Sequence, residues 1–104
     1  MTEQDKLLVD ELEECAAAFL IPLREGKGFH DDAYARFCQV LRECATIWVD
    51  REAIPRKAVN IFIDTNPWLV GCEDIYAEGV KQRIRDTELE LMELMLSCAT
   101  VPRT

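Results

Sequence analysis

The sequence predicts an all-α fold: an antiparallel bundle of three to four helices with a long C-terminal helix, in a single helical domain over residues 1–104. Three observations carry this prediction. Apolar residues recur at helical spacing through most of the chain. The breaks between these stretches are short and contain proline or glycine. The one stretch that alternates like a strand has no second strand to pair with, and short connections place successive helices antiparallel.

The composition is that of a folded domain. The chain has 104 residues, of which 49% are hydrophobic and 31% are charged, with only four glycines and four prolines. This supplies enough apolar material for one core. It contains too little glycine and proline for a low-complexity chain.

The first helix is predicted to begin at Thr2, whose hydroxyl can cap a backbone amide, with Asp5 three residues on in the capping-box position. Pro22 lacks an amide hydrogen and would clash with the carbonyl of Ala18, so we expect the helix to end or kink near Pro22. The stripe that we expect to face the core comprises Leu8, Val9, Leu12, Cys15, Ala16, Phe19 and Leu20.

The second helix is predicted to begin at Asp31 or Asp32, since either is a good N-cap, and to run to about Glu52. Pro55 ends it, because the residue before a proline is displaced from the α region. Its predicted buried side comprises Tyr34, Phe37, Cys38, Val40, Leu41, Cys44, Ala45, Ile47 and Trp48.

Residues 56–64 fit two structures. Pro55 can occupy the first position of a short third helix. Alternatively, Val59, Ile61 and Ile63 alternate as a strand would. We favour the helix because a lone strand has no partner.

The last long helix is predicted to open at Asn66-Pro67, with Asn66 as N-cap and proline at the first helical position. Either Gly71 or Gly79 is a place for a bend, because glycine costs about 1 kcal/mol against alanine inside a helix.

The apolar pattern of residues 76–98 is the clearest signal in the chain. A first row recurs every three or four residues and therefore lies on one helix face. A second row, Leu89, Met92 and Leu96, widens the apolar arc beyond half of the circumference. So wide an arc needs neighbours on more than one side, and we expect these three residues to form the interface of a homodimer. The first row is Tyr76, Val80, Ile84, Thr87, Leu91, Met95 and Cys98.

The charge of the chain bears on its partners. Twenty acidic and 12 basic side chains give a net charge of −8. Phosphate backbones and anionic lipid surfaces repel such a protein, so we expect no nucleic-acid partner and no membrane partner. A basic protein partner is favoured instead.

The cysteines and the first residues indicate a compartment. The five cysteines form no Cys-x-x-Cys pair and fall among apolar residues at helix-face positions, which is typical of free thiols in a reducing environment. Residues 1–6 lack the basic start and apolar run of a secretory signal. No apolar stretch approaches the roughly 20 residues that span a bilayer. We therefore expect a cytoplasmic protein.

The sequence shows no pattern that carries chemistry. His30 is the one histidine, and the chain has no zinc, calcium or di-iron ligand pattern and no complete phosphate loop. We predict no catalytic residue, no metal site and no cofactor. The alternative is a small carboxylate- or cysteine-dependent enzyme, or a ligand-binding bundle, with a pocket lined by two acids or by a cysteine with His30. Glu88 lies within the apolar arc of the last helix, and we expect a charge at the rim of an interface, with Arg85 placed to pair with it.

Two features point to recognition of a protein. The first helix carries an acidic surface that can bind a basic partner, although such a surface is also common on ordinary solvated helices. Tryptophan is enriched at binding hot spots; we assign Trp48 to the core and expect Trp68, if either, to be exposed. The prediction is a non-catalytic helical protein-binding domain, an acidic inhibitor, immunity or regulatory protein acting on a basic partner. Its predicted partner-binding residues are Asp10, Glu11, Glu13, Glu14 and Trp68.

Overall fold

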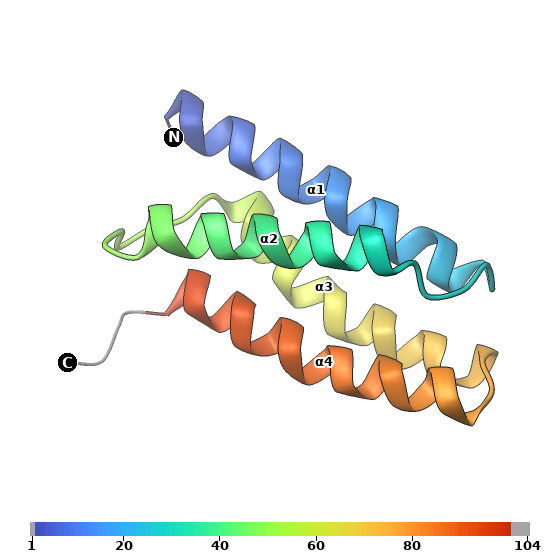
Figure 1. Ribbon diagram of the computed structural model, residues 1–104. Helices are drawn as coiled ribbons and strands as arrows, with labels where there is room; N and C mark the ends of the chain where they lie inside the picture. The colour runs from blue at the N-terminus through green and yellow to red at the C-terminus, as the bar shows by residue number, and fades with distance from the viewer. Residues whose placement is uncertain (1, 101–104) are drawn as a thin grey trace.

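The computed structural model describes residues 2–100 and is a bundle of four helices (Figure 1). The helices are α1 (Glu3–Arg24), α2 (Asp31–Trp48), α3 (Arg56–Cys72) and α4 (Glu78–Ala99), with a 3₁₀ turn η1 (Glu73–Ile75) before α4. No strand occurs within residues 2–100. The predicted all-α class and the long C-terminal helix are confirmed.

Each helix runs antiparallel to the one before it in the chain (Figure 1). α1 packs against α2 and α3, and α4 packs against the same two helices, so α1 and α4 occupy opposite corners of the bundle. The link from α2 to α3 therefore joins diagonal corners. As a result, α3 and α4 form one side of the molecule together.

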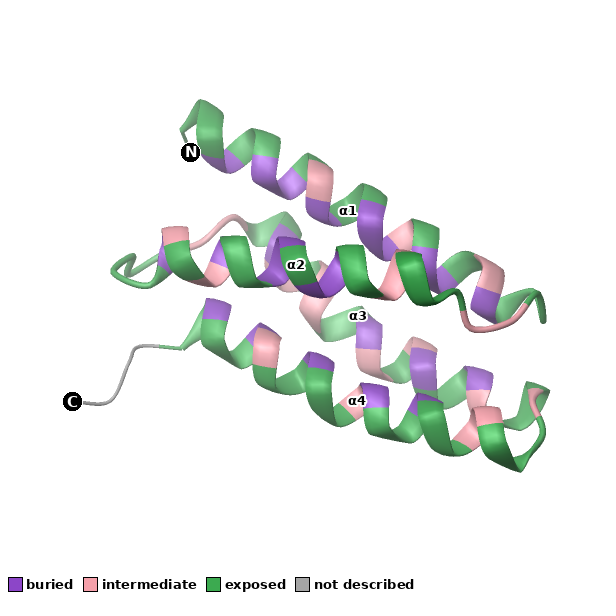
Figure 2. Ribbon diagram, in the orientation of Figure 1, coloured by how far each residue is buried: buried purple, intermediate pink, exposed green. Residues whose placement is uncertain are grey.

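The core lies along the facing sides of the four helices, as the buried residues in Figure 2 show. Its largest fully buried side chains include Trp48, Phe19 and Phe37, each of which stabilises the fold by roughly 1.5–3 kcal/mol through apolar burial. Phe29 and Tyr34 pack on Phe19 with ring centroids 5.2 and 5.1 Å away. These aromatic rings close the junction between α1 and α2.

The predicted capping box at the start of α1 is confirmed. Thr2 accepts a hydrogen bond from the Asp5 amide at 3.0 Å, and the Asp5 carboxylate accepts one from the Thr2 amide. Asp5 is buried and also accepts hydrogen bonds from the Trp48 indole at 3.0 Å and the Arg51 guanidinium at 2.9 Å. The Arg51 guanidinium, with the indole, lowers the Asp5 pKa from 3.8 to about 2. Asp5 therefore ties the start of α1 to the end of α2.

The end of the first helix agrees with the sequence expectation, and the end of the second helix does not. α1 ends at Arg24, two residues after Pro22. α2 ends at Trp48 rather than near Glu52, because the Arg51 amide bonds the Trp48 carbonyl at 3.0 Å while its side chain turns back to the buried carboxylate.

The third helix confirms one prediction and corrects another. Residues 56–64 are helical, as favoured over the strand alternative, but the helix continues through Asn66-Pro67 to Cys72. Asn66 is therefore not an N-cap. Ala58, Thr65, Leu69 and Cys72 all face the core, and their burial requires one continuous helix. Pro67 lies on the exposed side, where the carbonyl that lacks its amide donor meets water.

Candidate functional site

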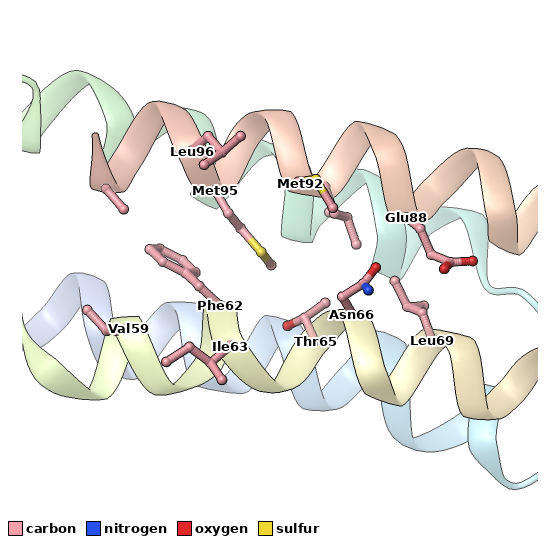
Figure 3. Close-up of a pocket in the computed structure, with 12 residues that line it drawn as sticks. Val59, Phe62, Ile63, Thr65, Asn66, Leu69, Glu88, Met92, Met95 and Leu96 are labelled. Carbon is pink, nitrogen blue, oxygen red and sulfur yellow. The ribbon is translucent and has the colours of Figure 1, made fainter. Parts of the chain in front are cut away.

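A groove of about 280 Å³ runs between α3 and α4. Its residues come from the two helices in equal number, and their side chains converge from both sides (Figure 3). Nine of the twelve are apolar. The lining residues are Val59, Phe62, Ile63, Thr65, Asn66 and Leu69 of α3, and Glu88, Leu91, Met92, Met95, Leu96 and Ala99 of α4.

The floor of the groove is part of the core, whereas its rims are exposed. Leu69, Leu91 and Met95 are buried beneath it. At the rims, Ile63 of α3 is 64% exposed, and Met92 and Leu96 of α4 are 46% and 51% exposed. The first row is buried from Ile84 onward, as predicted, whereas Tyr76 lies before α4 begins. The second row of α4 opens to solvent.

The apolar surface extends beyond the groove. Leu89 is 66% exposed and lies three residues before Met92, on the same side of α4. Val70 is exposed seven residues after Ile63, on the same side of α3. Five of the nine exposed large hydrophobic residues of the described chain therefore belong to α3 and α4. Exposed apolar residues gathered on two neighbouring helices are typical of an interaction site.

One acid interrupts the apolar lining. The Glu88 Oε2 atom is buried and has no hydrogen-bond partner within the described structure. Burial raises the Glu88 pKa above its ordinary 4.5, and hydrogen bonding to and repulsion from Glu73 add to the rise, while Arg85 opposes it. Arg85 does not form the expected ion pair with Glu88, because its Nε donates to the Glu73 carboxylate at 2.7 Å. The Glu88 end of the groove is therefore acidic.

The predicted acidic surface of α1 is partly neutralised. Glu11 pairs with Arg36 of α2, and Glu13 pairs with Lys57 of α3 at 3.1 Å. Asp10 and Glu14 are exposed. Two of the four carboxylates thus join helices of the bundle, and the surface does not present four free charges.

Trp68 lies away from the groove and is half-buried. Its indole donates a hydrogen bond to the Leu20 carbonyl at 2.9 Å, and the Arg24 guanidinium lies 4.6 Å from its ring centre. The side chain thus joins α3 to α1. Trp48 is buried in the core, as expected.

A depression of about 210 Å³ between α1 and α2 holds two acids and a thiol, Glu11, Glu14 and Cys15. Glu11 is in its ion pair with Arg36, and burial raises the Cys15 pKa. His30 is not among the residues that line it. This arrangement supplies no histidine for the thiol.

The cysteines and the acidic side chains of the described residues are candidate metal ligands and nucleophiles. All five cysteines are free and buried, and burial raises the pKa of Cys44 to about 12 and that of Cys98 to about 11, so both thiols are protonated at neutral pH. Residues 2–100 contain no cluster of three histidine, cysteine or acidic side chains placed to hold a metal ion. Within the same residues, no helix has the length and apolar character needed to cross a bilayer.

The sequence indicated only one wall of the groove. Met92 and Leu96 were predicted as interface residues and Glu88 as a rim charge, but Val59, Phe62 and Ile63 were assigned no role. The run of apolar residues from Ile61 to Ile63 was the available signal, since a helix apolar on adjacent positions exposes one of them.

Comparison with protein-family models, with curated proteins and with solved structures gave no match.

Proposed function

We propose that this protein is a non-catalytic helical protein-binding domain that receives a helix of its partner in the α3–α4 groove. The observation that carries the proposal is the open apolar groove itself, with buried residues as its floor and exposed Ile63, Met92 and Leu96 at its rims. Apolar side chains at such exposure favour association, because covering them removes apolar surface from water.

The shape of the groove suits a helix. From Val59 to Leu69 the wall formed by α3 is roughly 15 Å long at 1.5 Å per residue. A partner helix of about three turns covers that length, with apolar residues at positions i, i+4 and i+7 as anchors. The flexible side chains of Met92 and Met95 adapt to the shape of an incoming residue.

The groove is favoured over the acidic surface of α1 as the contact site. Glu11 and Glu13 already pair with basic residues of the bundle. The net charge of −8 still attracts a basic partner and speeds its encounter. An inhibitor, immunity or regulatory role towards such a partner is consistent with this charge. Five buried free thiols favour the reducing cytoplasm as its location.

A homodimer is the second candidate, and the exposure of Leu89 favours it. Leu89 lies outside the groove, so a helix held between α3 and α4 leaves much of it in water, whereas a second bundle can cover it together with Met92 and Leu96.

The test is capture from the source cell with three baits: wild type, the double variant Met92→Glu with Leu96→Glu, and Leu7→Glu. Leu7 is a matched control because it is exposed and apolar but belongs to α1. We expect a captured protein that, once purified, binds wild type and Leu7→Glu alike and binds the groove variant at least tenfold more weakly. Equal binding to all three baits would remove the groove from the proposal.

A further inference from the structure

We infer that the groove selects a basic amphipathic helix, in which a lysine or arginine at one end of the apolar stripe pairs with Glu88. This inference rests on the proposed function and specifies the partner of the same groove.

Glu88 lies at the end of the groove formed by Asn66 and Leu69 (Figure 3). It is the one ionisable residue among the twelve that line the groove, and no cation lines it. Its Oε2 atom is buried without a hydrogen-bond partner in the described structure. A buried acceptor of this kind costs free energy until a donor reaches it, and a cationic donor from a partner removes that cost.

The surroundings of Glu88 have an excess of negative charge. Glu73 of η1 lies next to it, and Arg85 of its own helix donates to Glu73 at 2.7 Å and lies 3.9 Å from Glu78. The guanidinium of Arg85 therefore pairs with two other carboxylates and not with Glu88. The nearby Lys81 pairs with Asp74 at 3.2 Å. From α3, the groove residues at this end are the uncharged Asn66 and Leu69.

A second copy of the chain fits this end of the groove poorly. Two grooves that face each other across a twofold axis bring two Glu88 carboxylates into an apolar interface, and their lining residues supply no cation. A buried charge without a partner opposes association. A helix of opposite charge avoids this opposition, so charge complementarity favours a basic partner over self-association.

Protonation of Glu88 should make the affinity of the groove for a helix depend on pH. A cation stabilises the carboxylate, whereas an apolar neighbour stabilises the protonated form. The pKa of Glu88 is raised above its ordinary 4.5. The carboxylate therefore gains a proton as the pH is lowered from neutrality towards 4.5, and the affinity for a basic helix falls. Affinity for an uncharged helix rises over the same range.

The experiment uses two pairs of stapled helical peptides of 16 residues with leucine at positions i, i+4 and i+7. Within a pair the peptides differ only at one position, a turn beyond the leucines, which is lysine or norleucine. The position is at the carboxyl end in one pair and at the amino end in the other, so that both directions of the helix in the groove are tested. Binding is measured by fluorescence anisotropy at several pH values with wild type, Glu88→Gln and Glu93→Gln, the last being an exposed acid of α4 outside the groove lining.

We expect one lysine peptide to bind wild type and Glu93→Gln about tenfold more tightly than its norleucine counterpart at neutral pH. Glu88→Gln should reduce the difference to less than twofold and remove both pH slopes. Circular dichroism confirms that the variant is folded, and Glu88→Leu serves the same comparison should glutamine destabilise the bundle.

Three outcomes would overturn the inference. If norleucine peptides bind as tightly as lysine peptides and Glu88→Gln changes neither, the groove binds helices without selecting charge, and the proposed function stands. If no peptide binds with a Kd below about 1 mM, the groove is not a helix site and both proposals fail. If the protein dimerises as its concentration is raised and the peptides dissociate the dimer, the occupant of the groove is a second copy of the chain.

Discussion

The α1–α2 side of the bundle and the α3–α4 side are built from similar amphipathic helices but end as different surfaces. Between α1 and α2, aromatic rings around Phe19 fill the junction, and Asp5 joins the two helices through Trp48 and Arg51. Between α3 and α4, the corresponding space is an open groove with apolar rims. The difference shows that apolar periodicity indicates which residues favour burial. Whether those residues are buried depends on the neighbouring helices.

Replacing an aromatic ring on each side gives the largest predicted contrast. Phe37→Ala leaves a cavity in the closed core and should lower the free energy of unfolding by about 3–5 kcal/mol. Phe62→Ala widens a groove that already opens to solvent, so the loss should stay below about 2 kcal/mol. Urea unfolding followed by circular dichroism measures both. Equal losses would mean that the groove side is packed as tightly as the closed side.

Pro67 is expected to lower the free energy of unfolding, because it removes one hydrogen bond from α3. Pro67→Ala restores an amide donor to the Ile63 carbonyl inside α3 and should raise the free energy of unfolding by about 1–2 kcal/mol. Part of the gain is offset by the greater freedom of the unfolded chain. Thermal unfolding provides the measurement. A lower melting temperature for Pro67→Ala would show that the proline fits α3 without strain.

The Asp5 junction on the closed side should be sensitive to acid. Its pKa falls from 3.8 to about 2 on folding, so the ionised carboxylate contributes stability that is complete above pH 3.8 and lost as the pH falls through about 2. Asp5→Asn lacks this contribution at every pH. The difference in unfolding free energy between wild type and Asp5→Asn should therefore be greatest at neutral pH and shrink towards pH 2. A difference that is constant with pH would contradict the assignment.

The smallest effect on stability is expected on the exposed row of α4. Leu89→Glu with Met92→Glu should change the free energy of unfolding by less than about 1 kcal/mol, since both side chains already meet water. Light scattering of wild type at micromolar concentration should give the mass of one chain when no partner is present. A dimer that these two substitutions dissociate would instead assign the exposed row to self-association.

Local patterns accounted for much of the fold. The capping box of Thr2 and Asp5 and the inward row of Ile84, Thr87 and Leu91 were all predicted and confirmed. One element was not predictable in this way. Asn66-Pro67 has the local signature of a helix start, but the burial of residues on both sides of it keeps α3 continuous.

The candidate site was predictable in part. Met92, Leu96 and Glu88 were singled out because their angular positions on one helix follow from spacing alone. Phe62 and Ile63 were missed, because a groove wall depends on which helix lies opposite. The ion pairs of Glu11 and Glu13 were missed for the same reason, since their basic partners come from α2 and α3.

The spacing of apolar residues was sufficient to predict that the chain is helical, which rows of α1, α2 and α4 face inward, and that α4 carries more apolar surface than one face can bury. These properties are local, because the spacing of residues along one helix sets their direction. The packing of the helices was needed to show that α3 passes through Pro67, that α3 and α4 lie side by side, and that Glu88 lies at one end of the groove between them. These properties depend on contacts between residues distant in the chain. The free energy gained by apolar burial between helices exceeds the local conformational preference of any single residue.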